Sequence, residues 1–373
     1  MSLFTLRGGL SRPQSIALGI AGLILFFLAW WGLAEFYSEQ KPIIEGYETR
    51  LPSAFADDDS LAVHIDLDSL ARADSAAFAN AKVFEKVYPL LPPPQRVFTS
   101  YPGLIQKDEL LKNTWRSVWL NIQGYFWAVL ISIPLGFLIG LLPLFRGLFS
   151  KQVDALRYLP LTALTGVFII WFGIEDQMKI AFLAFGIIVY LLPVVVQRID
   201  EVQDVYLQTV YTLGAKNWQT IKSVYIPAVM SKLMDDIRVL TAISWTYIII
   251  AELLNRKGGI GSLIYLKARQ GKLEGMFAAL IVIILIGFLQ DRIFSYFDKR
   301  LFPHKHLKSV REGLKETEYG ILALLGTVLL LILQSEFVPS LSGIFATLAP
   351  VLIVTSIIII LYGEFKLFQS KTQ

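Results

Sequence analysis

The side chains that most often carry out enzymatic chemistry are scarce in this sequence. It contains no cysteine and three histidines, His64, His304 and His306. The last two lie close together in a basic segment with no third ligand evident, which favours solvated charge over a metal site. The sequence also has no phosphate-binding loop of the form G-x-x-x-x-G-K-[ST], so we expect no ATP hydrolysis by this chain. We therefore predict no catalytic, cofactor-binding or metal-binding residues.

Carboxylates provide two further candidates for functional sites. The three aspartates at 57–59 could hold calcium, but no glycine-punctuated pattern of twelve ligand-bearing residues follows, so a solvated loop is favoured. Glu252 lies at the end of an apolar stretch, and an acid within a membrane is costly and often functional. The polar triplet at 255–257 follows almost directly. This favours a position for Glu252 at the outer membrane interface over a functional role.

A polar, helix-forming segment between long apolar stretches is the third candidate. It runs from Gln208 to Pro227 with the sequence Q-T-V-Y-T-L-G-A-K-N-W-Q-T-I-K-S-V-Y-I-P. Gly214 permits a sharp turn, because it adopts conformations that a side chain penalises. Pro227 is expected to limit the second arm, because it lacks a backbone donor and disfavours helix before it. Trp218 offers a large contact of the kind that anchors protein interfaces.

The composition is that of a protein with many membrane spans. Hydrophobic residues make up 55% of the chain and charged residues 17%, so we expect an all-α, polytopic helical membrane protein. A spanning helix needs about 20 mostly apolar residues. About eight stretches approach that length: 16–34, 118–142, 159–173, 179–197, 237–254, 276–294, 319–333 and 341–362. The third and the seventh are short for a full span.

Charged residues orient these spans. Arg7 and Arg12 precede the first span without an acid, and the loop at 143–158 is also basic, which places both segments inside. A cleavable signal peptide is disfavoured, because the first apolar run is too long. The acidic region from Glu35 to Arg116 suits the outer side, and its residues 67–88 have the apolar spacing of an amphipathic helix.

The spacing within the polar segment resembles the EAA loop of ABC importer permeases. After Gly214, Val224 and Ile226 occupy the expected positions before the proline. Four landmarks of the family follow in order: D-D-I-R-V-L at 235–240, W-T-Y-I-I-I-A-E-L-L at 245–254, G-G-I-G-S-L-I at 258–264 and D-K-R-L-F-P at 298–303. The proline run at 91–97 is similar to a segment of the nitrate, sulfonate and taurine branch.

The resemblance implies the permease subunit of an ATP-binding-cassette importer. Such a subunit forms the solute pathway, here for a small anion such as nitrate, a sulfonate or taurine, and is coupled to a separate ATPase. The implied organisation is an N-terminal spanning helix (1–37), an outward-facing insertion (38–97), a permease core (98–303) with its coupling loop at 198–236, and a linker with two extra spanning helices (304–373).

The resemblance also implies partners and a location. The expected partners are an ABC ATPase subunit that binds ATP and Mg, a second permease copy in a homodimer, a periplasmic or lipid-anchored solute-binding protein, and membrane lipid, with no nucleic acid. The expected location is the bacterial inner membrane, with several spans and both termini in the cytoplasm.

Two sets of functional residues follow from the resemblance. The residues expected to couple the chain to the ATPase are Gln208, Gly214, Ala215, Lys216, Trp218, Val224, Ile226 and Pro227. The residues that could line the translocation pathway are Thr162, Thr165, Gly166, Trp171, Trp245 and Glu252.

Two departures from the family pattern keep an alternative open. Gln208, Thr209 and Val210 stand where the family has Glu-Ala-Ala, so a charge-assisted hydrogen bond to the ATPase is lost. Two apolar segments also follow the point where the compact family ends. The alternative is a scaffold or assembly protein that has the permease fold and does not transport. A self-sufficient secondary transporter is disfavoured, because inverted repeats are not evident.

Overall fold

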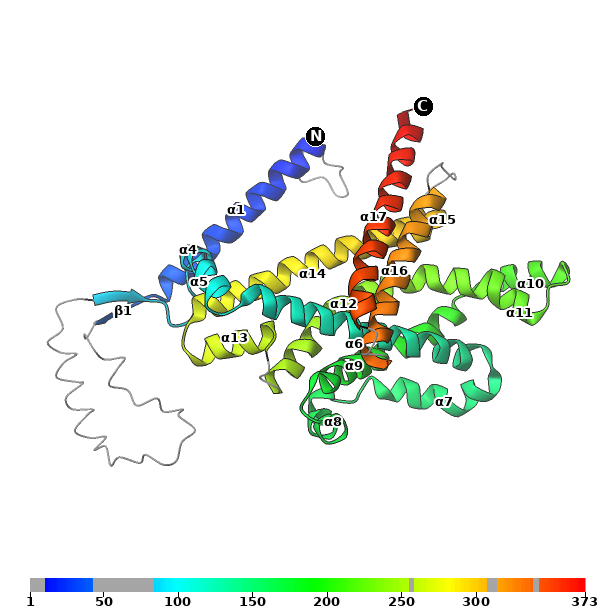
Figure 1. Cartoon of the computed structure of the whole chain (residues 1–373), viewed down its shortest axis with the longest axis horizontal. Coiled ribbons are helices and arrows are strands. Elements are labelled where there is room, and N and C mark those ends of the chain that lie inside the picture. Colours follow the sequence, from blue (N-terminus) through cyan, green and yellow to red (C-terminus); the bar gives the residue numbers. More distant parts are fainter. Residues whose placement is uncertain (1–10, 43–83, 255–257, 307–313, 338–341, 373) are drawn as a thin grey trace, which may run out of the picture. The chain divides into compact units, whose positions relative to one another are not determined.

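The computed structural model describes residues 11–42, 84–254, 258–306, 314–337 and 342–372. Figure 1 shows the chain coloured along its sequence. Within these ranges, seven helices are long and apolar enough to cross a membrane. The number becomes eight if the bent pair Pro143–Leu156 and Leu161–Phe172 forms one span. The prediction of an all-α membrane protein with about eight spans is confirmed.

The chain divides into two compact units. Unit 1 contains Met1–Lys107 and Leu266–Ala278, and unit 2 contains Asp108–Tyr265 and Ala279–Gln373. Helices α13 (Ile260–Arg269) and α14 (Leu273–Leu301) each contribute residues to both units.

Unit 1 begins with the apolar helix α1 (Arg12–Phe36), which covers the first predicted span. A two-stranded antiparallel sheet follows, in which β1 (Glu39–Pro42) pairs with β2 (Phe84–Val87). Strand β2 corrects the end of the helix expected at 67–88, because pairing with a distant segment gives its backbone groups partners that a local apolar pattern cannot reveal. Residues 67–83 of that prediction, and the aspartates at 57–59, lie outside the described residues.

The proline run leads into two short helices, α4 (Pro94–Thr99) and α5 (Tyr101–Gln106). Proline is tolerated in a first helical turn, where its missing N–H would have no partner in any case. The indole Nε1 of Trp30 donates to the carbonyl of Pro92 over 3.0 Å, and the Tyr101 hydroxyl donates to the carbonyl of Ala278 over 3.1 Å. These contacts connect α1, the proline run and the start of α14 within unit 1.

Unit 2 is built on three long helices, α6 (Leu110–Leu141), α9 (Asp176–Asp200) and α12 (Ile226–Leu254). Helices α6 and α9 pack closely because glycines of α6 meet branched side chains of α9: Gly136 faces Val195 and Gly140 faces Ile199. These glycines therefore allow the two helices to approach closely.

Polar side chains connect α12 to its neighbours in unit 2. The Asn121 amide donates to the Ser244 hydroxyl over 2.9 Å, and the Tyr125 hydroxyl donates to the carbonyl of Ile237 over 2.6 Å. On the side of α14, the Trp245 indole donates to Gln290 over 2.9 Å. Hydrogen bonds between spanning helices fix their register, since the bilayer offers these groups no other partner.

The third predicted span, 159–173, is not one straight helix. Helix α7 (Pro143–Leu156) occupies most of the expected loop at 143–158, and the 3₁₀ turn η1 (Leu161–Leu164) and helix α8 (Thr165–Phe172) follow after a bend of 97°. Pro160 has an extended backbone at the bend and lacks a donor, so no helix passes through it. Gly173, with φ 72°, ends α8.

The helix at the fifth predicted span is much longer than expected. The sequence predicts a span at 237–254, whereas the helical run extends without a break from Asn217 to Leu254. Polar residues near its middle find partners: Arg238 forms a two-point ion pair with Asp291 of α14, and Lys305 of the short helix α15 (Pro303–His306) donates to Asp235 over 2.6 Å. Because these charges are paired, the helix continues where hydropathy predicts a loop.

The two extra apolar segments form helices α16 (Leu314–Phe337) and α17 (Ser342–Thr372), which lie side by side (Figure 1). Lys366 of α17 pairs with Glu316 of α16 over 2.7 Å. Glu364 of α17 accepts hydrogen bonds of 2.7 Å from Arg300 and Tyr296 of α14. The pair is therefore connected to the last helix of the predicted permease core.

Candidate functional site

The predicted coupling segment forms a helix, a sharp turn and a second helical start. Helix α10 (Asp204–Thr212) ends before Gly214, which has φ 79°, a left-handed conformation that penalises any side chain. The Ala215 amide then donates to the carbonyl of Val210 over 3.0 Å, which closes the turn. The turn at Gly214 is thus where its sequence predicts it.

The second arm begins with helix α11 (Asn217–Thr220). The Gln219 side chain accepts a 2.8 Å hydrogen bond from the Lys216 amide, which supports this helical start. Three large side chains around the turn project into solvent: Tyr211, Leu213 and Trp218. Together they give the tip of the segment an exposed, partly aromatic surface, and we call these three residues the coupling tip.

Pro227 does not end the second arm, contrary to expectation. The π-helical turn η2 (Ile221–Tyr225) leads directly into α12, and Pro227 is the second residue of α12. Proline has no N–H, so a carbonyl in the preceding helical turn loses its usual hydrogen-bond donor. In the π turn before Pro227, carbonyls pair with N–H groups five residues later, which changes the partners of the carbonyls in that turn. The segment and α12 are therefore one continuous helical element.

A groove of about 650 Å³, lined by both apolar and polar side chains, lies next to the coupling segment. It is bounded by α10, by the start of α12 and by Lys305, and it includes Val224 and Pro227 from the predicted coupling set. Gln208, Gly214, Lys216 and Trp218 do not line it. The predicted coupling residues are therefore divided between an outer surface and this groove.

An ion-pair network fixes the base of the coupling segment. Arg198, at the end of α9, forms two-point contacts with Asp236 of α12 and with Glu201, at distances of 2.7 to 2.9 Å. Lys232 of α12 also reaches Glu201 over 3.0 Å. Hydrogen bonds from Arg198 and Lys232 keep the pKa of Glu201 below its ordinary value. Sequence reasoning missed this network, since the loop at 198–236 shows mixed charge without a recognisable pairing pattern.

The predicted pathway residues fall into two separate groups. Thr162, Thr165, Gly166 and Trp171 lie on η1 and α8, whereas Trp245 and Glu252 lie on α12. Trp171 lines an aromatic groove of about 470 Å³ between α6, α8 and α9, to which neither Trp245 nor Glu252 contributes.

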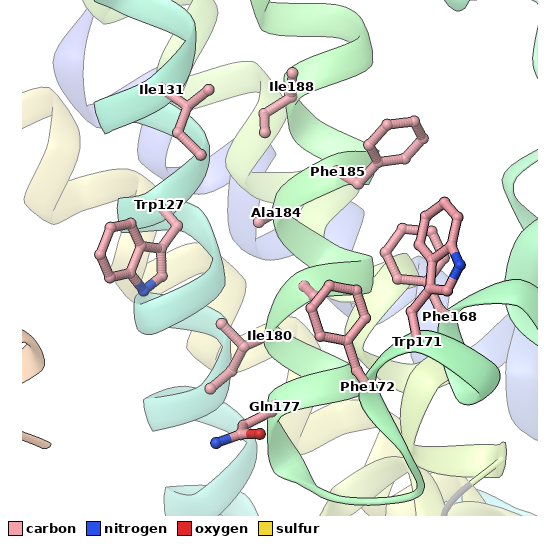
Figure 2. Close-up of a pocket in the computed structure, with 11 residues that line it drawn as sticks. Trp127, Ile131, Phe168, Trp171, Phe172, Gln177, Ile180, Ala184, Phe185 and Ile188 are labelled. Carbon is pink, nitrogen blue, oxygen red and sulfur yellow. The ribbon is translucent and has the colours of Figure 1, made fainter. Parts of the chain in front are cut away.

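Figure 2 shows this groove, in which rings from α6 and α8 surround the side chains of the first half of α9. Trp127, Phe168 and Phe172 supply three of the rings, and Gln177 is a polar side chain among them. Sequence reasoning identified only Trp171 there, because the other rings are spread over three helices.

Glu252 is buried, which corrects the favoured interpretation of an interfacial position. Its side chain is fully buried in unit 2, where it accepts hydrogen bonds from the Ser117 hydroxyl over 2.5 Å and from the Gly261 amide over 2.8 Å. The polar triplet that suggested exposure, 255–257, lies outside the described residues. Among the described residues, no group of three or more acidic or histidine side chains is arranged to hold a metal ion.

Residues 132–303 match the family model described as the inner membrane component of binding-protein-dependent transport systems. A protein of Methanocaldococcus jannaschii named as an ABC transporter permease is 29% identical over 206 residues, which cover 54% of this chain and 76% of that protein. The taurine transport system permease protein TauC of Escherichia coli is 26% identical over 218 residues, which cover 57% of this chain and 79% of that protein.

A protein of Bacillus subtilis named for the transport of aliphatic sulfonates is also similar, with 26% identity over 58% of this chain and 79% of its own length. Among solved structures, an inward-facing MetNI methionine ABC transporter aligns with a TM-score of 0.47 and 17% identity, over 51% of this chain and 94% of that chain.

Proposed function

We propose that the chain is the membrane-spanning subunit of an ABC importer, because residues 132–303 match the family model of inner membrane components of binding-protein-dependent transport systems. In this role it forms the solute pathway, and a separate ATPase subunit holds ATP and Mg and supplies the energy. The observation that carries the proposal is the coupling segment: an exposed apolar tip on a helical element that continues into a long span.

The coupling tip has the properties of a docking surface for the ATPase. Tyr211, Leu213 and Trp218 are large and exposed on a segment that is too polar to lie in lipid. Aromatic side chains of this kind often supply most of the affinity at protein interfaces. The ion pairs of Arg198 and Lys232 hold the base of the segment, so a force on the tip is transmitted to α9 and α12 instead of being absorbed by a flexible loop.

The bend between α7 and α8 supports a pathway along α8. Tyr158, Thr162 and Gly166 are exposed around this irregular backbone. Exposed non-helical backbone within a bilayer is tolerated only where protein or a water-filled cavity covers it. In the proposed assembly, a second copy of the chain and the aqueous pathway between the two copies provide this cover.

The proposed solute is a small anion of the sulfonate or taurine type, because relatives named for these solutes match more than half of the chain. A solute-binding protein outside the membrane delivers it, and both termini of the chain lie in the cytoplasm. This orientation follows from Arg7 and Arg12, which precede the apolar stretch of the first span.

The test of this function is substitution of the coupling tip. Trp218→Ala is expected to weaken binding of the ATPase subunit by about tenfold or more, since loss of a central aromatic anchor typically costs about 2 kcal/mol. Binding is measured by titration of the purified ATPase onto the chain in nanodiscs, and uptake of radiolabelled taurine is measured in proteoliposomes with the binding protein.

Trp115→Ala is the matched control. Trp115 is 69% exposed and Trp218 is 68% exposed, but Trp115 lies on α6 near the opposite end of α12. Equal effects of the two substitutions on ATPase binding would contradict docking at the coupling tip. ATPase binding without uptake of any sulfonate, taurine or nitrate would favour the alternative of a non-transporting scaffold, which the altered Gln208 and the extra helices α16 and α17 support.

A further inference from the structure

Glu252 holds together the end of unit 2 that lies farthest along α12 from the coupling segment. Its carboxylate accepts from the Ser117 hydroxyl of α6 and from the Gly261 amide at the start of α13. The Ser117 hydroxyl in turn accepts from the Ile260 amide over 2.9 Å. One carboxylate therefore joins the end of α12, the start of α6 and the start of α13.

Two glycines at the start of α13 leave space for the Glu252 carboxylate. Gly259 has φ 110°, and a Cβ there would overlap the Glu252 carboxylate. At Gly261 a Cβ would lie 2.9 Å from Glu252 Oε2 and 3.0 Å from the Cα of Ile249. Only glycine leaves room for the carboxylate at both positions, so the chain at the start of α13 is shaped around Glu252.

Charged side chains of α6 and α9 lie near the Glu252 carboxylate. Asp176 pairs with Arg116 of α6 over 2.8 Å and with the fully buried Lys179 over 3.2 Å. The Lys179 ammonium makes no hydrogen bond of ordinary geometry to any described residue, so charge attraction dominates the second pair. Arg116 and Lys179 also attract Glu252 electrostatically. A buried carboxylate is stable only with such partners. If the Glu252 carboxylate leaves them, it must be hydrated by water instead.

Helix α12 connects this cluster mechanically to the coupling segment. From Ile226 to Glu252 the helix rises by roughly 40 Å at 1.5 Å per residue. It continues from the coupling segment through the π turn without a break. A displacement of only about 1 Å at Glu252 would lengthen its hydrogen bonds beyond their effective range.

We propose that Glu252 is a latch that pins Gly259–Gly261, at the start of α13, onto α6, and that movement of α12 driven from the coupling segment releases this latch during each transport cycle. The proposal rests on the proposed function, because it takes the ATPase as the source of the movement. In the structure the latch is closed. Its release frees the Gly259–Gly261 segment from α6 and exposes the carboxylate to water.

The absence of cysteine from the sequence permits a clean test. The double variant Ser117→Cys, Ile260→Cys places one thiol on α6 and one at the start of α13, at the two residues that are now joined by the hydrogen bond from the Ile260 amide to the Ser117 hydroxyl. In the complex with its ATPase in nanodiscs, oxidation is expected to form a disulfide that keeps the latch closed. We expect oxidation to reduce ATP hydrolysis by the complex at least tenfold and dithiothreitol to restore it. We also expect ATP with vanadate to slow disulfide formation.

A second disulfide serves as the matched control. A Cβ at Gly140 lies 3.3 Å from the Cβ of Ile199, close to the separation found in disulfides. Gly140→Cys with Ile199→Cys joins α6 to α9, which pack closely and are expected to move together. Its oxidation should leave ATP hydrolysis unchanged.

The outcomes separate the latch from the proposed function. If neither the cysteine-free chain nor the reduced latch variant binds or stimulates the ATPase, the proposed function fails and the latch fails with it. If the reduced variant is active and the oxidised variant is equally active, the latch is overturned while the function stands. If ATP with vanadate leaves the rate of disulfide formation unchanged, the latch is likewise overturned, because movement driven by the ATPase would then not open it.

Discussion

At the scale of single residues, Glu252 shows how a side chain can impose requirements on residues far from it in the sequence. Its carboxylate occupies the space that side chains at positions 259 and 261 would need. Gly261 is also confined by the backbone of Ile249, which cannot move aside as a flexible side chain can. The glycines of the G-G-I-G stretch are thus explained by a carboxylate and by packing, in addition to turn geometry.

Gly261→Ala is therefore expected to destabilise the chain. The added methyl group would lie 3.0 Å from the Cα of Ile249, and overpacking of this kind typically costs about 1–3 kcal/mol. Thermal unfolding in detergent measures the effect. Gly287→Ala is the control, because a Cβ there meets nothing within 4 Å and alanine favours helix. Equal or higher stability of the Gly261 variant would contradict the close packing against Glu252.

At the scale of elements, the pairing of α6 with α9 depends on small residues of α6 that lie opposite large side chains of α9. Gly124, Gly136 and Gly140 each face a branched side chain of α9. Because lipid provides no hydrophobic drive between helices, close van der Waals approach and hydrogen bonds hold such pairs together. Small residues of α6 therefore permit the close packing of this helix pair.

Gly140→Ala is expected to separate the two helices and to lower stability by about 1–3 kcal/mol. The nearest atom to the new methyl group would be Cδ1 of Ile199, at 2.6 Å. Ile199→Val removes that atom, so the double variant should recover much of the loss. Unfolding of the single and double variants in detergent measures the coupling, and strict additivity of the two changes would contradict it.

At the scale of the whole molecule, α16 and α17 extend the protein beyond the matched family segment, which ends at residue 303. Arg300, near the end of α14, forms a two-point ion pair with Glu364 of α17, and Tyr296 donates to the same carboxylate. This partly buried cluster joins the extra helices to the core. It shows that the extension is packed against the core and is not merely linked to it.

The link between Glu364 and Arg300 predicts a coupled response to substitution. Glu364→Gln is expected to cost about 1–2 kcal/mol, because the Arg300 guanidinium loses its charged partner. Arg300→Gln should have a similar effect, and the double variant should cost less than the sum. Thermal unfolding of the four proteins measures this, and a coupling energy of zero would remove the ion pair as the link.

The sequence by itself determined the features that depend on composition and on local backbone chemistry. The apolar stretches predicted the spans because a bilayer of fixed thickness accepts only long apolar helices. Gly214 predicted a turn because positive φ favours glycine wherever it occurs. The spacing from Gly214 to Pro227 indicated the family, to which residues 132–303 were then matched.

Tertiary structure decided what depends on partners distant in the chain. Pro227 lies inside a continuous helical run from Asn217 to Leu254, in which a π turn precedes it. The charged residues of α12 in this run find partners on α9, α14 and α15. Strand β2 forms because β1 is available to pair with it. Glu252 is buried because Ser117 and Gly261 complete its hydrogen bonds. The free energy of a buried charge depends on such partners, and sequence patterns describe only near neighbours.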